Sequence, residues 1–246
     1  MARCGAATLL LLCALALVAD AGAKMVWDDL MYANTNNEKH QVLYSAHVVI
    51  DDEEIPTKFE LLLRSGDEDP SGSGEVWGQQ YDREGNKIFE INNVTFDRTD
   101  VLEISNDQDF TSILQVGSKL FTVAHFESKQ PAATYLAELS QDAAGELSVI
   151  KFENMDWTEF EGIWVPCAGS VTPWQTHLGS EEFGPNARYI SFETQEEWDA
   201  LKQTSIGGIA NTTEEFMRWY GKYPAEVDFA FIKENFNPYY YGYPWE

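Results

Sequence analysis

The fold class is indicated by the stretch FTSILQVGSKLFTVAHFE, residues 110–127. Two runs rich in β-branched and other apolar residues flank the short polar segment Gly-Ser-Lys at 117–119. This pattern is typical of a tight β-hairpin. It recurs downstream, where the runs 134–141 and 147–155 flank Asp-Ala-Ala-Gly-Glu at 142–146. The sequence therefore predicts consecutive antiparallel hairpins in this part of the chain.

The region before this hairpin has similar signals. Runs at 42–50 and 58–63 flank the acidic segment Asp51–Glu54, which we expect to be a solvated loop tip. Further strands are predicted at 75–82 and 87–96. Strands at this close spacing, joined by short polar turns, favour a mainly β fold of antiparallel meanders, as in the blades of a β-propeller or in a sandwich.

The last part of the chain combines helical signals with an aromatic end. Two Thr-x-x-Glu capping boxes, beginning at positions 194 and 212, predict two short helices at 195–204 and 213–220, inserted on the β scaffold. The final ten residues, NPYYYGYPWE at 237–246, are expected to form an aromatic strand. A natural terminus rarely leaves such a strand edge free. We therefore expect residues 24–246 to be the N-terminal portion of a longer domain.

The first 23 residues have the features of a secretory signal peptide. Arg3 precedes an apolar run, and Ala21-Gly22-Ala23 forms a small-residue cleavage site. The alternative is a retained anchor, but the apolar run is short for a membrane-spanning helix. We expect cleavage after Ala23, secretion of the mature chain and no stable membrane insertion.

Cleavage would leave Cys167 as the only cysteine of the mature chain, because Cys4 and Cys13 lie in the signal peptide. An intramolecular disulfide is then excluded. Cys167 is left as an inert buried thiol, an intermolecular link, or a reactive or metal-bound sulfur.

The net charge bears on the class of partner. The chain has a formal charge of −25 at pH 7, which repels phosphate backbones and argues against nucleic-acid binding. An excess of carboxylates suits hard cations such as Ca²⁺. Asn-x-Thr sequons at Asn93 and Asn211 are candidate glycan acceptors in a secreted chain.

The candidate site lies in PCAGSVTPWQTHLGSEEF, residues 166–183. Here Cys167 is followed by a Thr-Pro-Trp turn, by His177 and by the pair Glu181-Glu182. In an extended segment, adjacent glutamates point to opposite faces, so at most one of them faces the same centre as Cys167. A thiolate and a carboxylate that converge would suit a metal site. The alternative is an inert buried cysteine.

This stretch resembles the Cys-Ala-Gly-Gly-x-Thr-Pro-Trp-x-Thr-x-Leu-x-x-Glu-Glu signature of the PhoX-type alkaline phosphatases. The hairpins before it and the terminal aromatic stretch also look like segments of that family. The resemblance implies a six-bladed β-propeller that hydrolyses small-molecule phosphate monoesters at a cluster of Fe³⁺ and Ca²⁺ ions. It assigns the iron-bridging thiolate to Cys167 and metal-ligand roles to Glu182 and Glu246. It also implies a monomer, with the remaining acidic ligands beyond Glu246.

The match has departures, and other interpretations stay open. The chain differs from the family pattern at Pro166, Ser170, Gln175, His177 and Ser180. His177 is expected to contact phosphate or a metal, or to be an ordinary packed or surface histidine. Glu127 is expected to be a calcium ligand or an exposed charge at a strand end. The alternative functions are a non-catalytic calcium-binding propeller for adhesion or ligand binding, and another esterase or lactonase activity on the same scaffold.

Overall fold

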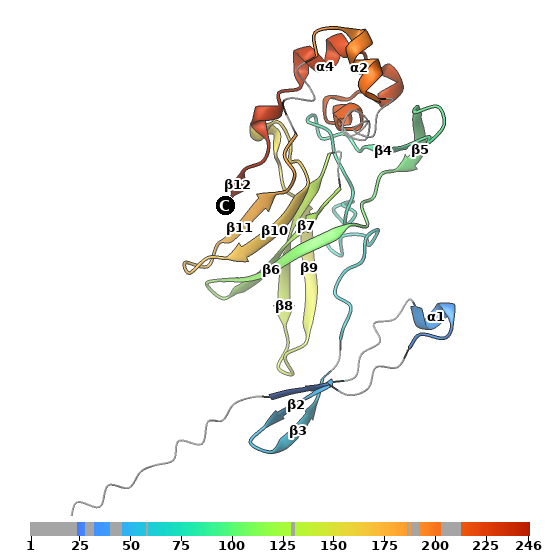
Figure 1. Ribbon diagram of the computed structural model, residues 1–246. Helices are drawn as coiled ribbons and strands as arrows, with labels where there is room; N and C mark the ends of the chain where they lie inside the picture. The colour runs from blue at the N-terminus through green and yellow to red at the C-terminus, as the bar shows by residue number, and fades with distance from the viewer. Residues whose placement is uncertain are drawn as a thin grey trace, which may run out of the picture. The chain divides into compact units, whose positions relative to one another are not determined.

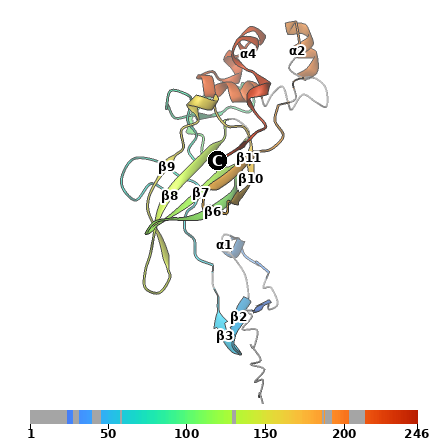
Figure 2. The same ribbon diagram turned by 90° about the vertical axis from the view of Figure 1, so that its left-hand side faces the viewer.

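The computed structural model separates into two compact units, Met1–Leu61 and Leu62–Glu246 (Figures 1 and 2). The residues it describes are 24–27, 32–39, 46–57, 59–128, 131–185, 187, 192–202 and 213–246. The predicted signal peptide and the Asn211 sequon lie outside these ranges. So does Thr212, the first residue of the second predicted capping box.

The first unit contains a small antiparallel sheet of three strands in the order β1-β2-β3, and one short helix. Its elements are β1 (Lys24–Trp27), α1 (Asn36–Lys39), β2 (Ala46–Ile50) and β3 (Glu53–Pro56). Asp51 and Asp52 form the turn between β2 and β3, with φ of 51° and 64°, a conformation that Asp tolerates. We predicted that Asp51–Glu54 is a loop between strands at 42–50 and 58–63. This is wrong for Glu53 and Glu54, which belong to β3. Pairing resumes at Glu53, directly after the two-residue turn.

The second unit is built on a four-stranded antiparallel sheet in the order β6-β7-β8-β9. Its strands are β6 (Gln108–Val116), β7 (Lys119–Phe126), β8 (Ala133–Gln141) and β9 (Leu147–Asn154). Both predicted hairpins are confirmed, and Gly117 and Gly145 have the positive φ that the two turns require. An aromatic core of Trp77, Phe126, Tyr135 and Phe152 packs on one face of this sheet.

A second sheet of three antiparallel strands, in the order β10-β11-β12, packs against β6 and β7 (Figure 1). Its strands are β10 (Pro166–Val171), β11 (His177–Glu181) and β12 (Pro244–Trp245). The predicted Thr-Pro-Trp turn joins β10 to β11, with the Gln175 N–H donating to the Thr172 carbonyl at 3.0 Å. Because β6 and β10 begin where β7 and β11 end, these four strand ends lie at the same end of the two sheets.

The first part of the second unit, before β6, is less regular than predicted. It contains only the short hairpin β4 (Phe89–Ile91) and β5 (Arg98–Leu102). The predicted strand at 75–82 is wrong, because only isolated bridges form there. Gly78 has a φ of 86° and its backbone lies against Ser105, so the chain bends at this point.

Helical turns and an aromatic core gather at one end of the second unit (Figures 1 and 2). The elements are α2 (Gln195–Lys202), a turn at 213–216 that continues into η3 (Met217–Tyr220), η4 (Pro224–Glu226), α4 (Phe229–Asn235) and η5 (Pro238–Tyr240); a further short turn, η1 (Thr158–Phe160), follows β9. Both predicted helices are present. The helix α4 was not predicted, although Asp228 caps it by accepting from the Phe231 N–H at 2.8 Å.

The predicted aromatic strand at 237–246 is wrong for most of its length. Asn237 caps a 3-10 turn, with its Oδ1 accepting from the Tyr239 N–H at 3.1 Å. Only Pro244–Trp245 pairs as a strand. The described chain is thus mainly β and antiparallel, as predicted. Within the described ranges, no helix has the length and apolar character needed to cross a membrane.

Candidate metal centre

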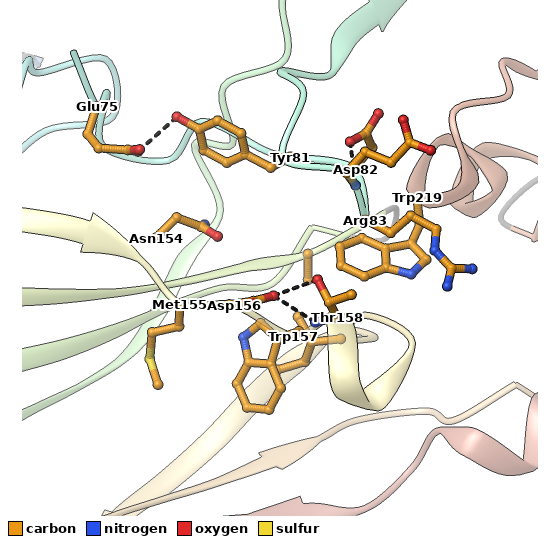
Figure 3. Close-up of a pocket in the computed structure, with 14 residues that line it drawn as sticks. Glu75, Tyr81, Asp82, Arg83, Asn154, Met155, Asp156, Trp157, Thr158 and Trp219 are labelled. Carbon is orange, nitrogen blue, oxygen red and sulfur yellow. Dashed lines mark hydrogen bonds between the residues drawn. The ribbon is translucent and has the colours of Figure 1, made fainter. Parts of the chain in front are cut away.

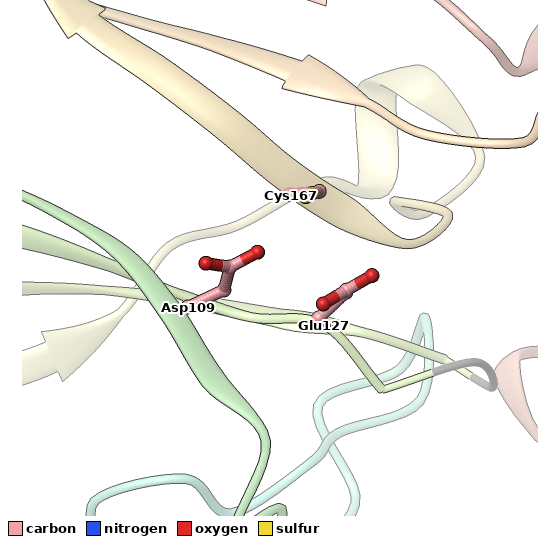
Figure 4. A group of neighbouring side chains, drawn as sticks. All are labelled: Asp109, Glu127 and Cys167. Atoms are coloured by element: carbon pink, nitrogen blue, oxygen red, sulfur yellow. The ribbon is translucent and has the colours of Figure 1, made fainter.

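Three potential metal ligands from three separate segments converge at the shared strand ends. Asp109 lies at the start of β6, Glu127 directly after β7, and Cys167 near the start of β10. Their ligand atoms all lie within 4.8 Å of one another. Figure 4 shows both carboxylates directed toward the strand that carries Cys167. This is the one group of its kind among the described residues.

Glu182 lies beside this cluster. Strand alternation predicts that at most one of the two adjacent glutamates faces Cys167, and the resemblance assigns the ligand role to Glu182. Glu182 lies close enough to Cys167 and Glu127 that its carboxylate raises the pKa of both groups. Glu181 points the other way and accepts backbone N–H groups of Trp164 at 2.6 Å and Gly242 at 2.5 Å. The two adjacent glutamates therefore have different roles: Glu182 faces Cys167, and Glu181 ties β11 to neighbouring backbone.

Local backbone irregularities direct Cys167 into the cluster. The register of β10 against β11 shifts between Pro166 and Gly169, which is a β-bulge. Val165, just before it, is buried with a φ of 45°, a strained conformation for a β-branched residue. The Val165 carbonyl accepts the Glu182 N–H at 2.8 Å. The same contact thus holds the strained residue and the backbone of Glu182.

The electrostatics of the cluster favour a bound cation. A hydrogen bond to Asp109, together with burial and the Glu182 carboxylate, raises the pKa of Cys167 to about 12. Burial and the neighbouring Asp109 and Glu182 carboxylates raise the pKa of Glu127. The crowded negative charges therefore favour the protonated forms of both groups. A cation would relieve the same repulsion and favour the ionised ligands.

A chain of buried polar side chains lies directly behind the cluster. His125 on β7 places its Nδ1 3.0 Å from the Cys167 carbonyl oxygen. Its Nε2 lies 2.7 Å from Nε2 of His177 on β11, whose Nδ1 lies 2.7 Å from the Ser112 hydroxyl oxygen. Burial lowers the pKa of both histidines, that of His177 to about 4. Both rings are therefore neutral at pH 7.

The remaining candidates of the sequence analysis lie at different distances from this centre. His177 is a packed histidine that reaches Cys167 only through His125. Glu246 is exposed, and its carboxylate accepts hydrogen bonds from Trp174 Nε1 and Thr176 Oγ1. It is not one of the three converging ligands, so its role as a ligand stays a prediction.

Asp109 and His125 were not singled out from the sequence. The hairpin turn at 117–118 gave a usable signal, because counting outward from it places residues 108–109 opposite 126–127. The position of the turn alone would thus have brought Asp109 close to Glu127. The approach of β10 to this hairpin has no such local signal.

A cavity of about 380 Å³ elsewhere in the second unit has a different character (Figure 3). Its walls include Trp157, Trp219 and several carboxylates. Three of those carboxylates have partners within the chain: Glu75 accepts from the Tyr81 hydroxyl at 2.8 Å, Asp82 from the Asn86 N–H at 2.8 Å, and Asp156 from the Thr158 N–H at 2.8 Å. The cavity therefore does not present a set of free metal ligands.

Comparison with known proteins gives no relative that could assign a role to this cluster, so the cluster is interpreted from its geometry. No family model, curated protein or solved structure matches this chain.

Proposed function

We propose that this chain is part of a secreted, metal-dependent phosphatase that hydrolyses phosphate monoesters. The observation that carries the proposal is the convergence of Cys167, Asp109 and Glu127, with the Glu182 carboxylate beside them. Two of these, Cys167 and Glu182, are the residues that the resemblance to PhoX-type phosphatases assigns to metal binding. The resemblance places both at one site, and strand alternation allows one of the two adjacent glutamates to face Cys167.

The donor set suits the ions that the resemblance implies. Thiolate sulfur favours iron or zinc, and carboxylate oxygens suit Fe³⁺ and Ca²⁺. Cys167 and Asp109 would hold iron, with Glu127 and Glu182 as further oxygen ligands. Bound cations would neutralise phosphate oxygens and supply an activated oxygen nucleophile for in-line attack.

The residues of this chain contribute positioning and charge. Without cations, the clustered carboxylates repel a phosphate monoester, so substrate binding depends on their being neutralised. Once the thiol and Glu127 are deprotonated, the four side chains are available as metal ligands. Each of them is held in place by a different segment of the chain. That arrangement provides the preorganisation on which phosphoryl transfer relies.

The wider architecture is part of the proposal. A four-stranded antiparallel meander such as β6-β7-β8-β9 is the unit of a propeller blade. We propose that this sheet is one blade of a six-bladed propeller. Glu246 would be a further ligand of the iron and calcium site. The mature protein would be a secreted monomer released after residue 23.

Metal content and hydrolysis of a chromogenic phosphate monoester test the function. We expect iron and calcium in the purified protein, and loss of most iron in Cys167→Ser and Asp109→Asn. Asp100→Asn, which changes an exposed carboxylate on β5, is the matched control and should keep its iron. An iron-free wild type that stays inactive with added Fe³⁺ and Ca²⁺ would overturn the phosphatase proposal.

The predominance of carboxylates supports one alternative, a non-catalytic calcium-binding module used for adhesion or ligand binding. Two of the three converging side chains are carboxylates, and so is the neighbouring Glu182; Ca²⁺ prefers such oxygen ligands. Calorimetric binding of Ca²⁺ with no iron and no phosphatase activity would favour this alternative. Hydrolysis of a carboxylic ester but not of a phosphate ester would instead indicate an esterase or lactonase.

A further inference from the structure

The buried pair of His125 and His177 has no part in the proposed chemistry, yet it contacts the strand segment that carries Cys167. The exposed fractions of the two side chains are 0% and 7%. Both rings lie between β7 and β11, and Trp245 covers them, stacking on His177 at 5.1 Å between ring centroids. A pair of polar rings at such a place needs a full set of hydrogen-bond partners.

The direction of each hydrogen bond in this chain follows from the group at its end, the Cys167 carbonyl oxygen. A carbonyl oxygen only accepts, so His125 Nδ1 carries the proton and donates to Cys167. In a neutral imidazole the other nitrogen is then an acceptor, so His177 Nε2–H donates to His125 Nε2. His177 Nδ1 is left as the acceptor of the Ser112 hydroxyl. The chain runs from Ser112 through both histidines to the Cys167 carbonyl, with every ring nitrogen satisfied.

The β-bulge explains why this carbonyl needs such a partner. The register pairs Pro166 with Glu181 and then Gly169 with Gly179, which leaves Cys167 and Ala168 without paired residues on β11. At this bulge the Cys167 side chain lies beside the carboxylates, and the Cys167 carbonyl oxygen lies 3.0 Å from His125 Nδ1. Since the chain of hydrogen bonds ends on a carbonyl, it cannot carry a proton to the sulfur.

Two other ligands of the cluster are close to the same pair. Glu127 follows His125 by two residues, which places both on the same face of the strand. Asp109 precedes Phe110, whose ring packs against His125 at 5.6 Å and His177 at 5.7 Å between centroids. Each of the three segments that supply ligands therefore contacts the histidine pair or includes one of its members.

We infer that His125, oriented by His177 and Ser112, is a positioning residue of the metal centre that fixes the bulged Cys167 segment against β7. This inference rests on the proposed function, because it assumes that Cys167 is a metal ligand. It adds two residues that neither donate to a metal nor touch substrate. Partners that orient metal ligands in this way typically change metal affinity by about 10–100-fold when removed.

The test uses Co²⁺ as a probe, because a thiolate bound to Co²⁺ gives charge-transfer absorption in the near ultraviolet. His125→Leu removes the donor to the Cys167 carbonyl. His125→Asn is the matched variant, because its amide nitrogen replaces Nδ1 and keeps that donor. We expect Co²⁺ affinity to fall by about 10–100-fold in His125→Leu, with a weakened thiolate band, and to stay close to wild type in His125→Asn.

A metal-free measurement separates this inference from the proposed function. The alkylation rate of Cys167, followed by mass spectrometry of its peptide, reports whether the thiol is still held against Asp109. We expect faster alkylation in His125→Leu and an unchanged rate in His125→Asn. A wild type without a thiolate–Co²⁺ band would overturn the metal centre, while the alkylation rates would still decide the positioning role.

Equal Co²⁺ spectra, affinities and alkylation rates in folded His125→Leu and His125→Asn would overturn the inference. If circular dichroism shows that His125→Leu does not fold, His125→Gln takes its place, because Gln reaches the Nε2 position and keeps the His177 contact but not the Cys167 donor. Identical behaviour of the Gln and Asn variants would overturn the inference in the same way.

Discussion

Gly169 on β10 leaves no room for a side chain, because the ring of Phe110 on β6 occupies the space where a Cβ would lie. The Leu178 carbonyl oxygen on the neighbouring strand would also lie only 3.0 Å from that Cβ. The absence of a side chain thus lets β10 approach β6 closely enough for Cys167 to reach Asp109. Close approach of the two backbones is what brings the cluster together.

This contact predicts that Gly169→Ala destabilises the protein. Inserting a methyl group into such a packed contact costs about 1–3 kcal/mol in the free energy of unfolding, which urea denaturation measures. Ser170→Ala, at the exposed next position, is the control and should be nearly neutral. In the double mutant with Phe110→Ala, the effect of Gly169→Ala should shrink. An unchanged effect would show that Phe110 is not its cause.

The buried His177 predicts a loss of stability in mild acid. Burial lowers its pKa from 6.5 to about 4 in the folded protein. Between these values the unfolded chain binds a proton at His177 that the folded chain does not bind, so stability falls as the pH is lowered through this range. The difference corresponds to at most about 3 kcal/mol. Urea denaturation at several pH values should show a shallower fall in His177→Phe, and the same slope in both proteins would contradict the assignment.

The hairpins could be predicted from the sequence because their signals are local. The β-branched and apolar runs, together with the glycine turns at Gly117 and Gly145, predict β6 to β9 with no knowledge of the rest of the chain. The errors occur where another signal overrides apolar composition. Gly78 bends the expected strand at 75–82, and Asn237 caps a turn in the expected terminal strand.

The site was predictable only in part, for a similar reason. Cys167 and Glu182 lie in one motif, and strand alternation separates Glu182 from Glu181. Asp109 and His125 reach Cys167 only because the β10–β11 sheet packs on β6 and β7. That packing depends on Gly169 and on the bulge at Cys167, whose effects require the tertiary contacts.

The sequon at Asn93 predicts an N-linked glycan when the chain is made in a eukaryotic secretory pathway. Asn93 is exposed in the turn between β4 and β5, next to Val94, whose exposed fraction is 84%. Asn92 stabilises the turn, because its Oδ1 accepts from the Val94 N–H at 2.9 Å. The side-chain amide of Asn93 is exposed to solvent. Treatment with a peptide-N-glycosidase should lower the mass of the wild type and of Thr95→Ser by the mass of this glycan. Thr95→Ala should lack the glycan at Asn93 and therefore show no such change at this site. Secreted protein without a modification at Asn93 would contradict the prediction.

The carboxylates around Cys167 predict a slow thiol in the metal-free protein. Because Asp109, burial and Glu182 raise the pKa of Cys167 to about 12, its thiolate is scarce at pH 8, where alkylation proceeds through the thiolate. We expect Cys167 in the folded protein to react with iodoacetamide more than about tenfold more slowly than in the unfolded chain. Asp109→Asn removes the largest contribution and should speed the reaction, whereas Asp100→Asn should not. Equal rates in the two variants would mean that exclusion of the reagent, not the neighbouring charge, protects the sulfur.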